Sequence, residues 1–135
     1  MDPVKKASKH SWKRDEILRV LQETNEHPTA DWIYQKLRPT IPDLSLGTVY
    51  RNLARFKEEG TVISVGTVNG QERFDAYTVP HTHFVCQCCG KVIDLESVAP
   101  SIESQAVASG LPGAKIETWS LTLTGLCPDC AENIN

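Results

Sequence analysis

The sequence has no long apolar run, and no stretch approaches the about 20 apolar residues that a membrane-spanning helix needs. Its first residues, MDPVKKASKHSWKRDE, contain no apolar core of the kind that a secretory signal has. We also find no internal repeat and no low-complexity tract. These absences lead us to expect a cytoplasmic protein with no membrane partner. In that compartment cysteines stay reduced, and a Cys-x-x-Cys pair indicates a metal more often than a disulfide.

An overall excess of basic residues is missing as well. The net charge of −3 over 135 residues argues by itself against a nucleic-acid partner. The charge is unevenly distributed, however, because residues 1–79 contain 12 of the 14 Lys and Arg against 11 Asp and Glu, whereas residues 80–135 contain 2 against 6. A basic first part joined to an acidic second part suggests a protein that binds DNA with one domain and senses a signal with the other.

Three helices followed by a β-hairpin are expected within residues 1–79, after a flexible N-terminal arm at residues 1–10. The helices are expected at residues 12–23, between Thr29 and Pro39, and at residues 46–59, with N-caps at Ser11, Thr29 and Ser45 and an end at Gly60. Strands at residues 62–65 and 73–77 flank Asn69-Gly70, a strong turn signal. This order of elements predicts a winged helix-turn-helix DNA-binding domain.

Residues 80–135 predict strand, helix and strand in turn. A hairpin-like stretch at residues 83–95 turns at Cys89-Gly90, a helix is expected at residues 98–109, and an alternating strand at residues 116–123. We expect a small α/β dimerisation domain with a four-cysteine zinc site. The fold class of the whole chain is therefore expected to be α+β, with a DNA-binding domain at residues 1–79 and a dimerisation and metal-binding domain at residues 80–135.

The third helix has the pattern of a recognition helix. Its apolar positions form one inward stripe: Leu46, Val49, Leu53 and Phe56. The side chains left outward near its N-terminal end are Ser45, Thr48, Tyr50, Arg51 and Arg55, where a recognition helix meets base edges and phosphates. Lys13 is expected to add a phosphate contact. A solvated helix face with ordinary charges would show the same pattern.

Four of the five cysteines form two matched Cys-x-x-Cys pairs, Cys86 with Cys89 and Cys127 with Cys130. Two such pairs supply the four thiolates of a structural zinc site, which would fasten the end of the chain to the first hairpin. Loss of that zinc is expected to cost the second domain its cross-link and its dimer. Cys88 lies between two ligands and is expected to point away from them as a small, partly buried residue.

The remaining ligand-type residues predict a second, different metal site. His27, Asp75, His81, His83 and Asp94 are not used by a four-cysteine zinc site. His81 and His83 lie two apart on an extended segment and can face one ion. Three imidazoles and two carboxylates suit Fe²⁺ or Mn²⁺ better than structural zinc. Because these ligands come from both domains, the ion would fix the arrangement of the two domains, as in a switch.

Four segments resemble the Fur-type metalloregulators in order and spacing: HPTADWIYQKL, SLGTVYRNL, RFDAYTVPHTHFVCQCCGKVIDL and GLCPDC. The resemblance implies a dimeric repressor that binds a palindromic, A·T-rich operator. It assigns the four paired cysteines to structural zinc and His27, Asp75, His81, His83 and Asp94 to regulatory iron or manganese. It also places Tyr50 and Arg51 on the recognition helix.

Within that family the chain is most similar to the peroxide-responsive members. Asp94 stands where iron-sensing members tend to carry Glu, and Trp119 stands where they tend to have a histidine on the last strand. The resemblance implies that bound ferrous iron reacts with hydrogen peroxide and that oxygen is added to His27 or His81, which releases metal and DNA. Manganese would support DNA binding without this chemistry.

Three other functions share part of this pattern. The same fold could respond to iron or manganese availability alone. A zinc-uptake regulator usually recruits a cysteine to the regulatory set, and Cys88 is poorly placed for that. A hydrolytic or redox metalloenzyme would need a general base in a substrate pocket, and apart from His10 in the expected N-terminal arm the sequence has no spare histidine and no nucleophile motif. We therefore expect no enzyme activity.

Overall fold

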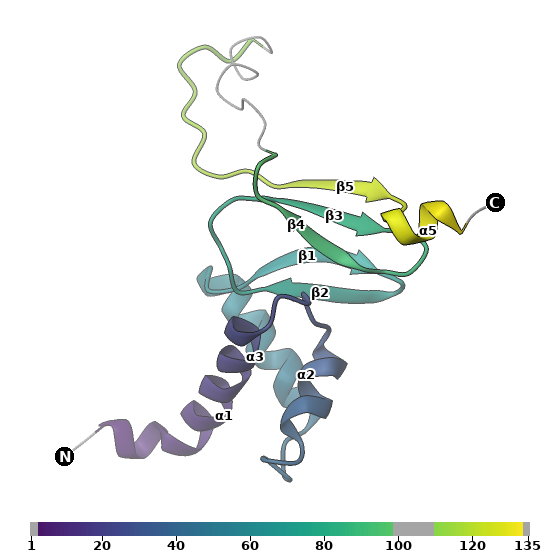
Figure 1. Ribbon diagram of the computed structural model, residues 1–135. Helices are drawn as coiled ribbons and strands as arrows, with labels where there is room; N and C mark the ends of the chain where they lie inside the picture. The colour runs from purple at the N-terminus through teal and green to yellow at the C-terminus, as the bar shows by residue number, and fades with distance from the viewer. Residues whose placement is uncertain (1–2, 99–109, 134–135) are drawn as a thin grey trace. The chain divides into compact units, whose positions relative to one another are not determined.

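The chain divides into two compact units, Met1–Thr78 and Val79–Asn135. The computed structural model describes residues 3–98 and 110–133 (Figure 1). The helix expected at residues 98–109 lies outside the described residues, apart from Val98 at its first position.

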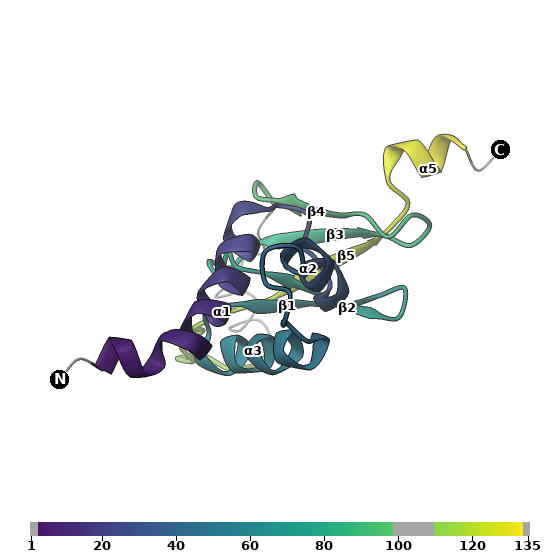
Figure 2. The ribbon, with the colours of Figure 1, turned by 90° about the horizontal axis from the view of Figure 1, so that it is seen from below.

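The first unit contains three helices and then a hairpin: α1 (Pro3–Glu23), α2 (Ala30–Leu37), α3 (Leu46–Glu59), β1 (Ile63–Val68) and β2 (Gln71–Asp75). Figure 2 shows the same helices from below, with α2 seen almost end-on. This order confirms the predicted helix-turn-helix with a β-hairpin wing.

Helix α1 begins earlier than the sequence suggested. We expected residues 1–10 to form a flexible arm and Ser11 to cap the helix, but the helix starts at Pro3 and passes through Ser11. Proline suits the first turn of a helix because its missing N–H needs no partner there. The following PVKKASKH contains no glycine and includes good helix formers, so nothing in it ends the helix before Trp12.

The two shorter helices are bounded as predicted. The Thr29 Oγ1 accepts the Trp32 N–H at 3.0 Å and caps α2, which ends before Pro39. The Ser45 Oγ accepts the Thr48 N–H at 3.1 Å and caps α3. Gly60 ends α3 in the left-handed conformation, at φ 79°, which glycine adopts without steric cost.

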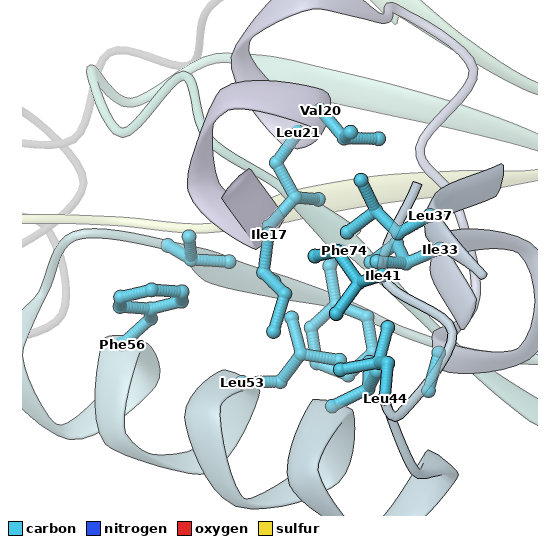
Figure 3. Packing of buried hydrophobic residues seen from close by; sticks show 13 residues of the cluster. Ile17, Val20, Leu21, Ile33, Leu37, Ile41, Leu44, Leu53, Phe56 and Phe74 are labelled. Atoms are coloured by element: carbon cyan, nitrogen blue, oxygen red, sulfur yellow. The ribbon is translucent and has the colours of Figure 1, made fainter. Parts of the chain in front are cut away.

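The core of the first unit is built from all three helices and the wing. Figure 3 shows Ile17 of α1, Ile33 and Leu37 of α2 and Leu53 of α3 directed toward Phe74 of β2. All five side chains are at most 2% exposed. Burial of each such side chain contributes about 1.5–3 kcal/mol, so this cluster is what holds α3 against the wing.

The wing turns at the predicted dipeptide. Asn69 has φ 53° and Gly70 φ 81°, the two positive values that a type I′ turn needs. Strand β1 is longer than expected because a bulge at Gly66, φ 113°, lets the pairing continue from Ser64 to Val68.

The second unit is a three-stranded sheet in the order β4-β3-β5, with β3 at Thr82–Cys86, β4 at Val92–Leu95 and β5 at Leu121–Gly125. Strand β3 pairs antiparallel with β4 and parallel with β5. The strand expected at residues 116–123 begins only at Leu121. Its ladder partner β3 begins at Thr82, which pairs with Leu121, so earlier residues have no backbone partner on β3.

A short helix that the sequence did not lead us to expect ends the second unit. Helix α5 (Pro128–Glu132) follows Cys127 at the N-cap position and has proline in its first turn. The proline was the available signal for a helix start. Within the described residues, no helix is both long enough and apolar enough to span a membrane.

The cap of α2 gives a test of the first unit. Thr29→Ala removes the oxygen that accepts the Trp32 N–H and should lower the free energy of unfolding by about 1 kcal/mol. Urea denaturation followed by circular dichroism measures this change. Thr78→Ala, at an exposed position outside the regular elements, should change the stability by less than about 0.5 kcal/mol. Equal stability of the two variants would contradict the role of the cap.

Candidate metal centres and nucleic-acid interface

The sheet of the second unit brings the two Cys-x-x-Cys pairs together. Cys86 is the last residue of β3 and pairs with Gly125 of the parallel strand β5. Both strands therefore end at the same edge, and the chain leaves β5 through Cys127 into α5. The N–H of Gly90 donates to the Cys86 carbonyl at 2.9 Å, which closes the turn that carries Cys89.

The four paired cysteines form one cluster, in which one Sγ from each of Cys86, Cys89, Cys127 and Cys130 lies within 4.8 Å of the others. The Sγ atoms of Cys89 and Cys127 are 3.9 Å apart. Four sulfur atoms at about 2.3 Å from a tetrahedral zinc ion are separated by about 3.8 Å from one another. The cluster therefore fits Zn²⁺ in both donor type and spacing.

Backbone donors prepare Cys86 to act as a thiolate. The N–H groups of Cys89 and Cys127 point at the Cys86 Sγ, at 3.5 and 3.3 Å. These bonds, with the Cys89 N–H making the largest contribution, lower the pKa of Cys86 from 9.0 to about 6. The neighbouring thiol of Cys127 raises the pKa of Cys130. One thiolate is thus favoured at neutral pH, whereas a second in the same place needs a cation to offset the repulsion.

Cys88 is exposed and does not belong to the four-sulfur cluster. Its thiol nevertheless contributes to the raised pKa of Cys130 and so lies within reach of that side chain. The expectation that Cys88 is partly buried and points away from the ligands was wrong. The tight turn that places Cys86 and Cys89 on one ion leaves the intervening thiol exposed but still beside the cluster.

In the first unit, His27 and Asp75 lie side by side. His27 is in the connection between α1 and α2, and Asp75 is the last residue of β2. The His27 Nε2 is 3.3 Å from the Asp75 Oδ2, and both side chains are largely buried. The other oxygen of Asp75, Oδ1, accepts the N–H of Tyr77 at 2.9 Å, which fixes the carboxylate with Oδ2 toward the imidazole.

His27 also has an unusual backbone conformation, with φ 54°. A non-glycine residue in this left-handed region costs about 1–2 kcal/mol. Such a conformation persists only where neighbouring groups hold it, and it is often found at functional sites. The sequence placed His27 at the break between two helices but contained no signal for this conformation.

In the second unit, two imidazoles converge on one carboxylate oxygen. His83 and Asp94 are opposite each other in the β3–β4 ladder, and His81 directly precedes β3. The Nε2 atoms of His81 and His83 are 3.1 and 3.3 Å from the same Asp94 Oδ1. The two ring centres are 4.3 Å apart. All three side chains can therefore place a donor atom on one ion.

The hydrogen bonds of His81 test whether a cation fits. Its Nδ1 is 2.7 Å from the carbonyl of Val79, which can only accept, so Nδ1 carries the proton. In the neutral ring Nε2 then carries a lone pair and no proton, and it lies 3.1 Å from the carboxylate oxygen Oδ1 of Asp94. Two electron-pair donors at this distance repel each other unless a proton or a metal ion lies between them. An imidazole held through Nδ1 to a carbonyl is the usual form of a histidine ligand.

The predicted regulatory ligands are thus found as two groups, one in each unit. His27 and Asp75 form the first, and His81, His83 and Asp94 form the second. Neither group contains sulfur. Their nitrogen and oxygen donors fit Fe²⁺ or Mn²⁺, in contrast to the four-sulfur cluster.

The outward face of α3 carries the polar residues predicted to contact DNA. Val49, Leu53 and Phe56 are buried, whereas Tyr50 is 52% exposed and Arg51 is exposed. The Arg51 Nη2 donates to the Thr48 Oγ1 at 3.0 Å, and that oxygen is 2.9 Å from the Ser45 Oγ. Arg51 is therefore held at the first turns of the helix.

Four basic side chains surround one surface cavity in the first unit. The cavity has a volume of about 360 Å³ and is lined by Lys13, Arg14, Thr48, Arg51, Asn52 and Arg55. Lys13 also pairs with Asp43, Nζ to Oδ2 at 3.1 Å, and Arg55 pairs with Glu59. The basic residues of α1 and α3 thus form one positive surface, of a kind that attracts phosphate.

A winged helix joined to a unit with a four-cysteine cluster and a separate histidine–carboxylate group defines a metal-binding regulator of transcription. The model of the ferric uptake regulator family matches residues 5–124 of this chain. The chain belongs to this family, whose members are DNA-binding regulators of transcription rather than enzymes.

Two relatives indicate the branch of the family. The chain is 36% identical over 123 residues to the peroxide operon regulator of Bacillus subtilis (strain 168), an alignment that covers 90% of this chain and 83% of the relative. It is 35% identical over 123 residues to the peroxide-responsive repressor PerR of Staphylococcus epidermidis, which covers 90% and 81% of the two chains. The chain is therefore a repressor of the Fur family that is similar to peroxide-responsive members.

Solved structures show the same fold. The Campylobacter jejuni peroxide stress regulator matches with a TM-score of 0.77 and 30% identity, over 93% of this chain and 94% of its own. The Helicobacter pylori ferric uptake regulator Fur, described as having three functional metal-binding sites, matches with a TM-score of 0.78 and 26% identity, over 98% of this chain and 89% of its own.

The assignment of zinc to the four-cysteine cluster can be tested by substitution. Cys130→Ser removes one of four sulfur ligands and should abolish tight zinc binding, because serine is a poor ligand at neutral pH. Metal analysis of the purified protein, with thermal unfolding in parallel, measures the loss. Cys88→Ser is the matched control and should retain one zinc ion per chain. Zinc loss in the Cys88 variant, or zinc retention in the Cys130 variant, would contradict the assigned ligand set.

Proposed function

We propose that this repressor is a homodimer that binds operator DNA while a ferrous or manganous ion occupies His27, Asp75, His81, His83 and Asp94, and that it releases the DNA in response to hydrogen peroxide. The convergence of donor atoms carries this proposal. Each unit holds nitrogen and oxygen donors 3.1–3.3 Å apart with no sulfur among them. The peroxide-responsive relatives support the same choice of signal.

One ion shared by the two units would make the site a switch. Neither group alone offers more than three ligands, whereas both together offer five nitrogen and oxygen donors. An ion that binds all five favours the one arrangement of the units in which they meet. Occupancy of the site then selects the arrangement that binds DNA, and loss of a ligand removes that selection.

The ligand histidines are also the proposed target of the signal. His27 and His81 would hold Fe²⁺, which supplies the redox chemistry that activates hydrogen peroxide. In the net reaction one oxygen atom of the peroxide would be inserted into a C–H bond of a ligand imidazole and the other would leave as water, so that the imidazole is oxidised by two electrons and the peroxide is reduced by two. Oxygen added to His27 or His81 changes the ring and weakens its nitrogen as a ligand. Manganese would hold the same five residues without this oxidation.

The proposed macromolecular partner of the repressor is double-stranded operator DNA. The exposed N-terminal part of α3 presents Ser45, Thr48, Tyr50 and Arg51 to the major groove, and the positive cavity beside it can hold a backbone phosphate. A homodimer would place two such helices on a palindromic operator, which we propose to be A·T-rich. We propose that the protein is located in the cytoplasm.

A second candidate function keeps every residue in its role and changes only the signal. Iron or manganese availability alone could control occupancy of the five-ligand site. The similarity to the Helicobacter pylori ferric uptake regulator favours this alternative. The two functions differ in one respect, which is whether a ligand histidine is consumed.

The peroxide response is tested by mass spectrometry. Protein loaded with zinc and Fe²⁺ is treated with dilute hydrogen peroxide, digested and analysed for added oxygen. We expect one oxygen atom on the peptide that contains His27 or on the one that contains His81, together with loss of operator binding. Protein loaded with Mn²⁺ is the control and should remain unmodified. Unmodified peptides in the iron-loaded sample would leave metal availability as the signal.

The DNA-binding face is tested by Arg51→Ala. Because Arg51 lies exposed at the start of α3, its loss should weaken operator binding about tenfold or more, measured by fluorescence anisotropy in the presence of Mn²⁺. Lys91→Ala is the control, because it removes one positive charge from an exposed position in the second unit. This variant should bind the operator normally.

Lys13→Ala provides a contrast within the same experiment. Its loss should weaken binding to every sequence and reduce the salt dependence by about one unit of slope, as expected for a phosphate contact. Unchanged affinity of the Arg51 variant would mean that α3 does not read the operator.

A further inference from the structure

Arg73 fastens the loop that carries His27 to the wing. Its Nη2 donates to the carbonyl of Glu26 at 2.8 Å, and its Nε donates to the carbonyl of His27. The N–H of the next residue, Phe74, donates to the carbonyl of Pro28 at 3.0 Å. Three successive loop carbonyls are therefore bound by two successive residues of β2.

The same strand supplies the second ligand of the first unit. Asp75 follows Phe74 directly and ends 3.3 Å from the His27 Nε2. The bonds made by Arg73 and Phe74 therefore determine how far the imidazole lies from the carboxylate. The Phe74 side chain is buried in the core, so the strand itself cannot shift freely.

The conformation of His27 shows why such bonds are needed. At φ 54° the residue occupies a region that side chains other than glycine rarely adopt. Without Arg73 the carbonyls of Glu26 and His27 lose these donors, and the loop can relax toward ordinary backbone angles. Such a relaxation would move the imidazole away from Asp75.

Arginine suits this task better than lysine. The arginine guanidinium is planar, and its nitrogen atoms can donate to two carbonyls at once in a fixed geometry. The lysine ammonium is a compact charge at the end of a flexible chain and offers no such fixed geometry. Arg73 is only half-buried, so its charge remains partly hydrated.

We propose that Arg73 is a positioning residue for the regulatory ion: by binding the Glu26 and His27 carbonyls it holds His27 beside Asp75 and links occupancy of the ion site to the wing. This inference rests on the proposed function, in which His27 and Asp75 are ligands. It adds a residue that touches no metal and yet governs metal affinity.

The experiment compares four variants of the zinc-loaded full chain: Arg73→Met, Arg73→Lys, Glu72→Gln and Asp75→Ala. Affinity for Mn²⁺ is measured by electron paramagnetic resonance of the free ion. Arg73→Met should bind about tenfold more weakly than the wild type, as is common when support of a ligand is removed. Arg73→Lys should be intermediate. Glu72→Gln disturbs the neighbouring ion pair with Lys57 and the contact with Ser64, neither of which involves the loop that carries His27, and should bind normally.

A second measurement needs no regulatory metal. Hydrogen exchange of the Phe74 amide reports whether the bond to Pro28 is intact. We expect faster exchange at this amide in Arg73→Met than in Glu72→Gln, with zinc content and thermal unfolding unchanged in both variants.

The outcomes separate this inference from the proposed function. Normal Mn²⁺ binding by Arg73→Met, together with loss of binding by Asp75→Ala, would overturn the role of Arg73 and leave the site intact. Normal binding by Asp75→Ala would overturn the ligand set and with it the proposed function. A loss in Arg73→Met that is accompanied by lower thermal stability, and that lysine does not restore, would mean a general structural role and would also overturn the inference.

Discussion

Electron-pair donors gathered at one point repel one another unless a proton or a metal ion lies among them, and the rest of this structure depends on that constraint. The four sulfur atoms of the second unit lie within 4.8 Å of one another. Two imidazole nitrogens face a single oxygen of Asp94, and His27 faces an oxygen of Asp75. Each arrangement is favourable once a cation is bound, so the described residues of this small chain are organised around metal as much as around an apolar core.

Sulfur donors and nitrogen or oxygen donors suit different metal ions. The four-sulfur cluster joins β3 to the segment that leads into α5, and its backbone N–H groups already favour one thiolate at neutral pH. Such a site suits permanent structural zinc. The nitrogen and oxygen donors suit Fe²⁺ or Mn²⁺ instead, in agreement with the regulatory role proposed for them. The ligand-type residues between His81 and Asp94 thus fall into two sets, one that offers sulfur and one that offers nitrogen and oxygen.

Much of the fold could be predicted because the decisive signals are local. The caps at Thr29 and Ser45, the end at Gly60 and the Asn69-Gly70 turn each act within a few residues, and the structure confirms all four. The start of α1 and the start of β5 could not be predicted as well. The first depends on the absence of any helix breaker after Pro3, and the second on where the partner strand β3 begins.

In the candidate sites, too, features set by short-range patterns could be predicted from the sequence, whereas features set by distant contacts could not. The two Cys-x-x-Cys pairs and the opposition of His83 and Asp94 follow from short spacings and a hairpin register. The left-handed backbone of His27, the bonds from Arg73 and the nearness of Cys88 to Cys130 depend on contacts between segments far apart in the sequence, or on the detailed shape of a turn. No pattern of residue types records those contacts.

The number of Mn²⁺ ions bound by the zinc-loaded protein tests the central claim most directly, because that claim is one ion shared by ligands from both units. The account predicts one tightly bound Mn²⁺ per chain in the wild type, and loss of that ion both in His27→Ala and in His83→Ala. Two ions per chain, one lost only in the first variant and the other only in the second, would contradict it.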